Sequence, residues 1–192
     1  MFPAVLTAHP SHFELRVFQA VNVDAGRVVD MVAMLLSSRP FGFMAAGLLF
    51  AIGLASARWT SLLLALATGI AVSDGVGSQV LKPWFARQRP CFALDASAVR
   101  WIGSAADIGS MPSLHAANFF ALAVIATAVD RRLAAPAFVA AVAVALSRVY
   151  LGVHWPLDVV AGACWGTISG GMAVAVLRRL ERRGADGSAT AS

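Results

Sequence analysis

His154 and Asp158 lie four residues apart at the start of an apolar stretch. Residues at this spacing share one face of a helix, so the carboxylate can accept a hydrogen bond from one ring nitrogen. That bond would fix the tautomer and leave the other nitrogen free to attack an electrophile. Because charge is costly to bury in a membrane, the pair is either a polar collar at a helix end or part of a catalytic site.

Ser113 and His115 begin another apolar stretch, directly after Pro112. A serine in this position is typical of a helix N-cap, and the free N–H groups of a first helical turn bind anions. His115 lies on the same turn and adds a second imidazole, which we expect to face the loop. Each residue alone is more typical of a cap or an interfacial histidine, but together with His154 they indicate a phosphate site.

Lys82, Arg89 and Arg148 are cations near the ends of apolar stretches, and Lys82 is the only lysine in the chain. An ammonium suits one phosphate oxygen, whereas a guanidinium binds two oxygens at once. Two imidazoles among such donors meet the needs of phosphoryl transfer, which are a nucleophile, an acid and charge stabilisation. No carboxylate cluster suited to Mg²⁺ is evident, so we expect neither a metal nor a cofactor.

Two further polar residues near these segments have less certain assignments. Arg87 is either a fourth phosphate-binding cation or a contact for lipid headgroups. Asp74 precedes Lys82 by about 12 Å of helix, and this separation favours a structural hydrogen bond over catalysis.

The composition places all of these residues in a membrane protein. Of 192 residues, 59% are hydrophobic and 13% are charged, whereas soluble domains carry about 25% charged residues. The pI is near 10.6, but the arginines cluster beside apolar stretches, which indicates membrane topology and not nucleic-acid binding. We predict one all-α membrane domain over residues 1–183 and a disordered tail over 184–192.

The apolar stretches predict a polytopic helical bundle of five or six spans. Four of them are long enough to cross a membrane: Trp59–Leu81, Ser113–Val129, Leu133–Leu151 and Leu157–Leu177. Phe41–Ala57 is a shorter fifth candidate. The residues before it, 27–40, are a tilted sixth span, a kinked extension of the fifth, or an interfacial helix.

Arginine positions predict which side of the membrane the polar segments occupy. Arg58, Arg131–Arg132 and the four arginines within 178–183 fall on one side if the last four spans alternate in direction. Short arginine-rich loops stay in the cytoplasm, so the tail is cytoplasmic. The three polar segments then meet at the external face, where we expect the active site.

These segments resemble the type 2 phosphatidic acid phosphatase (PAP2) superfamily, whose pattern is KX6RP, then PSXH, then SRX5HX3D. The matching residues are Lys82, Arg89 and Pro90; Pro112, Ser113 and His115; and Ser147, Arg148, His154 and Asp158. All three parts are complete and in order. The resemblance covers about Trp59 to Leu177.

The resemblance implies a role for each matched residue. His154 would attack phosphorus and form a phosphohistidine, with Asp158 orienting it. His115 would protonate the leaving oxygen and then activate water. The phosphate oxygens would be held by Lys82, Arg89, Ser113 and Arg148. The family needs no metal or other cofactor.

The resemblance also implies a substrate class and a location. We expect a lipid phosphatase in a bacterial plasma membrane, with its site facing the outside or periplasm. Candidate substrates are undecaprenyl diphosphate, which ranks narrowly first, phosphatidylglycerol phosphate, phosphatidic acid and the phosphates of lipid A. The alternatives are a phosphotransferase that passes the phosphate to a second lipid and, less favoured, a non-catalytic lipid-binding or lipid-translocating protein.

Overall fold

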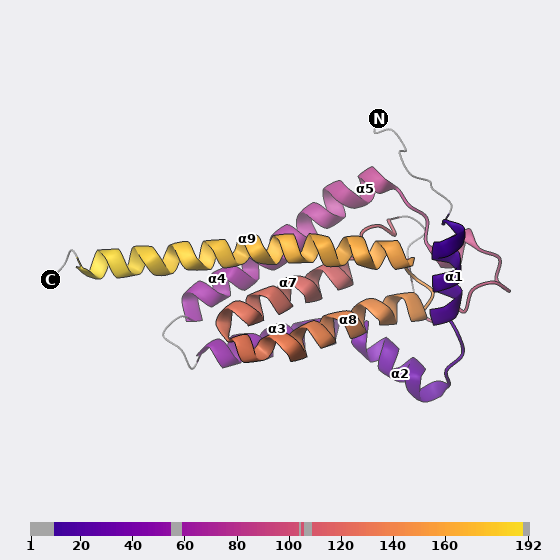
Figure 1. Ribbon diagram of the computed structural model, residues 1–192, viewed down its shortest axis with the longest axis horizontal. Coiled ribbons are helices and arrows are strands. Elements are labelled where there is room, and N and C mark those ends of the chain that lie inside the picture. The colour runs from indigo at the N-terminus through magenta and orange to yellow at the C-terminus, as the bar shows by residue number, and fades with distance from the viewer. Residues whose placement is uncertain (1–9, 55–58, 104, 106–108, 190–192) are drawn as a thin grey trace.

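The computed structural model describes residues 10–54, 59–103, 105 and 109–189, and all regular elements in these residues are helices (Figure 1). The predicted all-α class is therefore confirmed. The helices are α1 His12–Val21, α2 Arg27–Leu36, α3 Arg39–Leu54, α4 Trp59–Ile70, a π-helix Ala71–Leu81, α5 Lys82–Phe85, α6 Pro90–Ala93, α7 Leu114–Val129, a 3₁₀-helix Arg131–Leu133, α8 Ala134–Tyr150 and α9 Pro156–Ala189.

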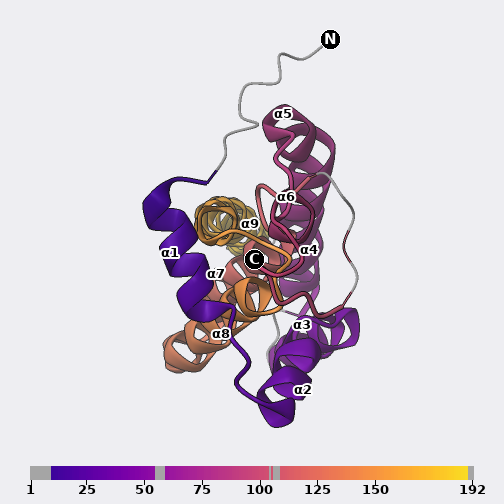
Figure 2. The same cartoon turned by 90° about the vertical axis from the view of Figure 1, so that its right-hand side faces the viewer.

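Helix α7 lies inside the bundle and contacts α3, α4, α8 and α9. Its side chains are buried on several faces, as expected for a helix that is apolar all round. Seen along the bundle axis in Figure 2, α1 crosses the end of the bundle, where it contacts α8 and α9. The long helices thus form a bundle that α1 covers at one end.

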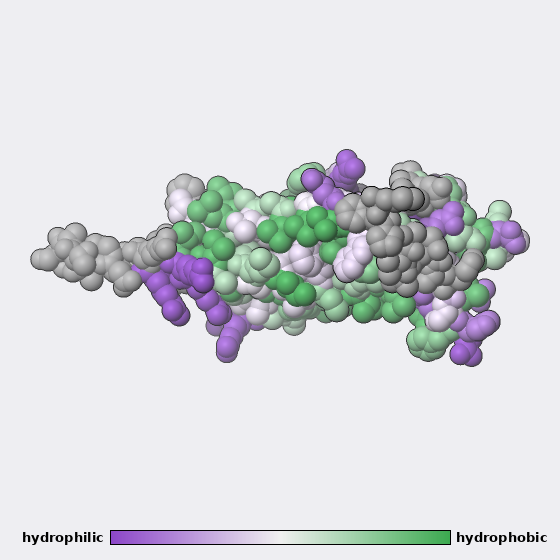
Figure 3. All heavy atoms as spheres, turned by 90° about the horizontal axis from the view of Figure 1, so that it is seen from above, coloured by the Kyte–Doolittle hydropathy of each residue, from purple (hydrophilic) through white to green (hydrophobic). Residues whose placement is uncertain are grey.

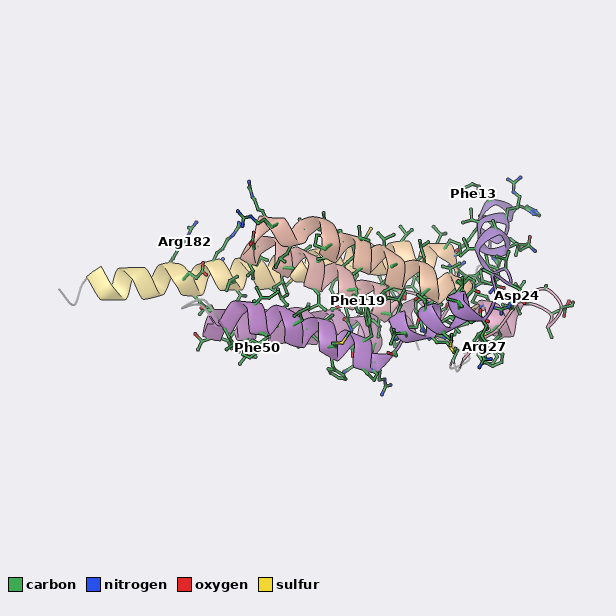
Figure 4. The ribbon with its side chains drawn as sticks, turned by 90° about the horizontal axis from the view of Figure 1, so that it is seen from below. Phe13, Asp24, Arg27, Phe50, Phe119 and Arg182 are labelled. Atoms are coloured by element: carbon green, nitrogen blue, oxygen red, sulfur yellow. The ribbon has the colours of Figure 1, made fainter. Side chains whose placement is uncertain are left out.

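The outer surface of the bundle is apolar over its middle. Figure 3 shows a green apolar region between hydrophilic residues at the two ends. Large exposed side chains include Val139, Leu146, Val160, Ile168 and Met172. Figure 4 places Arg182 at one end of the molecule and Asp24 and Arg27 at the other. This pattern is that of an integral membrane protein.

The predicted number of five or six spans is not confirmed. Length and composition identify three candidate spans in the described residues, Thr60–Phe85, Arg131–Tyr150 and Pro156–Arg182, or four if α2 and α3 count as one. The predicted span Ser113–Val129 is instead the 16-residue helix α7. Such a helix is shorter than the roughly 17–25 residues that a full crossing needs.

Helices α2 and α3 form a bent pair with an angle of 57° between them. Among the three expectations for residues 27–40, this arrangement matches the kinked extension. Pro40 lies in the first turn of α3. Its ring lacks an N–H and would clash with the carbonyl of residue 36, where α2 ends.

Helix α9 continues to Ala189 and so includes residues 184–189, for which composition predicts disorder. Extending an existing helix requires no new nucleus, which explains why a polar sequence can continue it.

Three glycines on α9 allow it to pack closely against α7. Gly162, Gly166 and Gly170 recur every four residues, and a Cβ on any of them would overlap the backbone of α7. Small residues at this spacing let two membrane helices bring their backbones together. As a result, the start of α9 lies against the start of α7, and the Ser113 N–H donates to the Asp158 carbonyl at 2.9 Å.

We predict that Gly166→Ala lowers the thermal unfolding temperature in detergent. The added methyl group would meet backbone atoms of Ala117, and overpacking of this kind costs about 1–3 kcal/mol. The matched control is Gly171→Ala on the same helix, because a Cβ there has nothing within 4 Å. Equal unfolding temperatures for the two variants would contradict the close packing.

Candidate active site

The three polar segments meet at a cavity of about 580 Å³. Five of the seven predicted site residues line it: Lys82, Arg89, His115, Arg148 and His154. The other two, Ser113 and Asp158, are fully buried at the neighbouring starts of α7 and α9. The structure therefore brings together residues that lie up to 76 positions apart in the chain.

His154 lies in the link between α8 and α9, and its ring is 2% exposed. Its Nε2 is 2.9 Å from a guanidinium nitrogen of Arg89. Since a guanidinium can only donate, Nε2 must accept, and the ring proton belongs on Nδ1. That nitrogen faces Asp158 Oδ2 at 3.5 Å, which is long for a formed hydrogen bond. Nε2 therefore carries the lone pair that a nucleophile requires, and in this structure that lone pair accepts a hydrogen bond from Arg89.

The His154 imidazole is neutral at physiological pH. Burial lowers its pKa to about 3, with Arg89 reinforcing this effect and the Asp158 carboxylate opposing it. Protonation would place a cation in a buried site beside two arginines. A neutral ring at pH 7 is the form that can attack phosphorus.

Asp158 is held by donors on both carboxylate oxygens. Oδ1 accepts from Arg87 at 2.8 Å, and Oδ2 accepts from the Trp155 N–H at 2.8 Å and from the Ser110 hydroxyl. The carboxylate is 0% exposed. These contacts leave its position little freedom relative to the His154 ring.

Arg87 has neither of the two roles that the sequence predicts for it. It is 5% exposed, and its guanidinium pairs with Asp158 and with Glu14, at 2.8 and 2.7 Å. It is absent from the cavity lining, so it is neither a headgroup contact nor a fourth phosphate-binding cation there.

The cations of the cavity are positioned by backbone carbonyls. Lys82 donates to the Gly109 carbonyl at 2.7 Å, and Arg89 donates to the Val153 carbonyl at 2.9 Å. Arg89 also donates to the Gly109 carbonyl, at 3.4 Å, so this one carbonyl accepts from both cations. Gly109 has a φ of +81°, a conformation that favours glycine. The loop thus fixes the two cations beside His154.

Several buried donors around the cavity have no hydrogen-bond partner among the described residues. They are the Nε of Arg89, the Nε of Arg148, the hydroxyl of Ser113 and the Nδ1 of His154. Ser113 occupies the predicted N-cap position, but its hydroxyl makes no capping bond. Buried donors are nearly always satisfied in proteins, and a phosphate would offer acceptors for such groups.

His115 enters the cavity from the first turn of α7. The backbone of Ser37, in the break between α2 and α3, lies beside its ring. The Ser37 hydroxyl meets the Ser147 hydroxyl at 2.8 Å, and Ser147 donates to the Val144 carbonyl. The bend between α2 and α3 therefore supports the second imidazole, a contact for which the sequence around Ser37 carries no motif.

The rest of the cavity is polar at Asp74 and Asn118 and again at Ser38 and Arg39, and it is otherwise largely apolar. Asp74 lines the cavity and accepts a hydrogen bond from Asn118 at 3.4 Å, which agrees with the expected structural role. The apolar lining comes from α3, α4 and α7: Gly42, Phe43, Ala46, Ile70, Leu114, Phe119 and Leu122. Figure 4 shows Phe119 beside α3. Its ring stacks on that of Phe41, with 5.5 Å between the ring centroids.

In the part of the chain that the structure describes, no group of three or more His, Cys, Asp or Glu side chains is arranged to hold a metal ion. The cationic side chains that line the cavity are those of Arg39, Lys82, Arg89 and Arg148.

Three residues of the site were missed by sequence reasoning: Glu14, Ser37 and Ser110. Ser110 lies three residues before Ser113 and donates to Asp158, so its closeness to a motif was a usable signal. Glu14 is 73 positions from its partner Arg87, and nothing local distinguishes it from other acidic residues of a helix end.

Comparisons with known proteins identify the family and the fold. Residues 58–182 match the family described as the PAP2 superfamily. A crystal structure of LpxE from Aquifex aeolicus is similar, with a TM-score of 0.68 and 24% identity, covering 91% of this chain and 99% of that one. So is a transmembrane PAP2 type phosphatidylglycerolphosphate phosphatase from Bacillus subtilis, with a TM-score of 0.61, 19% identity and coverage of 89% and 85%. No curated protein sequence matches.

Proposed function

The chain belongs to the PAP2 superfamily, and from this premise we propose that it is a lipid phosphatase that acts through a phosphohistidine. The observation that carries the proposal is one cavity lined by two imidazoles, four cations and an apolar wall. The cations suit a phosphate headgroup, and the apolar wall suits the first part of a lipid tail.

In the proposed reaction, His154 Nε2 attacks phosphorus. A P–N bond forms while the bond from phosphorus to the lipid oxygen breaks. His115, protonated beside the bound phosphate anion, donates a proton to that oxygen, and the lipid leaves. His115 then takes a proton from water, whose oxygen attacks phosphorus and breaks the P–N bond, releasing phosphate. Asp158 stabilises the positive charge on the ring during both steps.

The cations take the role that metal ions have in many phosphoryl-transfer enzymes. Charge develops on the equatorial oxygens of the transferring group, and fixed donors stabilise it without having to reorganise. Lys82, Arg89, Arg148 and Ser113 are the proposed donors, and the Nε atoms of the two arginines have no hydrogen-bond partner among the described residues. We therefore propose a metal-independent reaction.

The substrate is proposed as a class, a lipid monophosphate or diphosphate. Undecaprenyl diphosphate ranks narrowly first, because an outward-facing site is compatible with recycling of a polyprenyl carrier. Phosphatidylglycerol phosphate is supported by the name of the similar Bacillus subtilis protein. Phosphatidic acid and the phosphates of lipid A remain candidates of the same chemistry.

A phosphate-release assay with purified lipids in detergent tests this function. We expect the protein to release inorganic phosphate from at least one of the four lipids above, at an equal rate with and without EDTA. Loss of activity in EDTA that Mg²⁺ restores would contradict the metal-independent mechanism. Transfer of the phosphate to an added acceptor lipid without release would indicate the phosphotransferase, and no turnover of any lipid would overturn the proposal.

We place the site at the external face of a bacterial plasma membrane, because the arginine clusters lie at the opposite end of the bundle. Ser97 is exposed beside the site and Arg182 is exposed at the other end. In a background without Cys91 and Cys164, an impermeant thiol reagent added to intact cells should label Ser97→Cys and spare Arg182→Cys. The reverse pattern would invert the orientation.

A further inference from the structure

Helix α1 lies outside the residues that match the family, yet it inserts a carboxylate next to the proposed active site. It crosses the end of the bundle (Figures 1 and 2). Ser11 caps its start by accepting from the Glu14 N–H at 3.1 Å. Glu14 and Phe18 are one helical turn apart on the face that the bundle covers, and they are 3% and 0% exposed.

Both side chains contact the segment that carries His154. The ring of Phe18 packs on Trp155 with 5.2 Å between centroids. Glu14 Oε1 accepts from the Leu157 N–H at 3.0 Å, in the first turn of α9. A carboxylate at a helix start is stabilised by the exposed N–H groups and by the helix dipole.

Glu14 is linked to Asp158 through a single guanidinium. Arg87 donates to both carboxylate oxygens of Glu14, at 3.1 and 2.7 Å, and to Asp158 Oδ1 at 2.8 Å. The Arg87 guanidinium also lies over the Trp155 ring, 5.5 Å from its centroid. The three charged side chains are all nearly inaccessible to solvent, so water screens them little.

The charges in this cluster explain why a second carboxylate is needed. If Arg87 had only Asp158 as its counter-ion, one positive charge would cancel the negative charge that His154 requires. Glu14 takes two of the hydrogen bonds of Arg87 and balances its charge. Asp158 then keeps a net negative charge, and Oδ2 remains directed at His154 Nδ1.

We propose that Glu14 is a positioning residue for the reaction, which acts through Arg87 to keep Asp158 charged and directed at His154. The proposal rests on the phosphatase function described above. It makes α1, outside the matched family region, a functional part of the catalytic apparatus.

The test compares Glu14→Gln with the wild-type protein. Glutamine keeps the shape and an acceptor for the Leu157 N–H but removes the negative charge. The positive charge of Arg87 is then balanced by Asp158 alone. We expect kcat to fall by about 10–100-fold, the scale found when a partner behind a metal-bound histidine is removed, while KM stays within about twofold. The assay uses the panel lipid with the fastest turnover and counts only protein that elutes as a folded, monodisperse peak.

Asp24→Asn is the matched control. Asp24 belongs to the same amino-terminal region and also pairs with an arginine, Arg100, at 3.3 Å, but its side chain is 72% exposed. The substitution removes one negative charge that lies outside the network of Glu14, Arg87 and Asp158. We expect kcat to be unchanged. Equal kcat in Glu14→Gln and wild type would overturn the proposal.

A double variant separates a charge effect from a loss of folding. In Glu14→Gln with Arg87→Gln, both charges are gone and Asp158 keeps its own. We expect this variant to lose less activity than the product of the two single losses, the sign of residues that act as a unit. Losses that multiply, or a Glu14→Gln protein that loses activity only through unfolding, would assign Glu14 a purely structural role.

The ¹⁵N and ¹H signals of the His154 ring provide a readout that does not depend on turnover. We expect the Nδ1 proton of His154 to shift upfield in Glu14→Gln and to stay in place in Asp24→Asn. If no lipid phosphate is hydrolysed but this shift is seen, the proposed function fails and the positioning role stands. If lipids are hydrolysed and the shift is absent, the positioning role fails alone.

Discussion

Replacement of His154 by alanine abolishes phosphate release, because the proposed nucleophile and the P–N bond are lost together. The other groups remain, but water would have to attack phosphorus without a covalent intermediate. We expect kcat to fall by about 10⁶-fold, the scale of the loss when a serine protease loses its nucleophile. The measurement is phosphate release from the panel lipid with the fastest turnover, per amount of folded protein.

The control for this variant is His12→Ala, since His12 is an exposed histidine on α1. It should retain wild-type turnover. The two variants should also bind vanadate differently, because vanadate resembles the five-coordinate phosphorus that His154 would contact. Full activity of His154→Ala would remove the proposed mechanism.

Asp158→Asn should have the second largest effect. In serine proteases, removal of the carboxylate that orients the catalytic histidine lowers kcat about 10⁴-fold, and we expect a similar loss here. Asparagine cannot replace the hydrogen bonds either. Both carboxylate oxygens accept, from Arg87 on one side and from Ser110 and Trp155 on the other, so the amide NH₂ would face a donor in either orientation.

The same argument predicts a cost in stability. A buried group left unsatisfied costs about 1–3 kcal/mol, so the thermal unfolding temperature should fall as well as kcat. Asp95→Asn, an exposed loop position, is the control and should change neither. A loss of less than about tenfold in folded Asp158→Asn would show that His154 does not depend on this carboxylate.

The sequence and the structure agree best where antiparallel helices decide the geometry. Lys82, Ser113 and His154 lie at the ends of successive apolar helices, and such helices place these ends on one face of a membrane whatever their detailed packing. The gathering of the polar segments was therefore predictable. The cavity holds the two imidazoles and the three cations of the motifs, together with Arg39, which the motifs do not include.

The span count was less predictable because it depends on burial. The apolar residues of α7 face other helices, whereas those of α9 in part face outward, and hydropathy does not separate the two situations. Pro40 indicated a break, but only the structure shows that α2 and α3 bend by 57° there and that Ser37 of the break reaches the ring of His115.

The sequence by itself determined the class of this protein and the residues of the proposed reaction, since hydropathy and motif spacing are local properties of the chain. Tertiary structure alone decided what holds those residues in place. The partners of Asp158 include Arg87 and Ser110, 71 and 48 positions away, and Glu14 reaches Arg87 across 73 positions. Such pairs join segments that are far apart in the chain, and no local pattern encodes them.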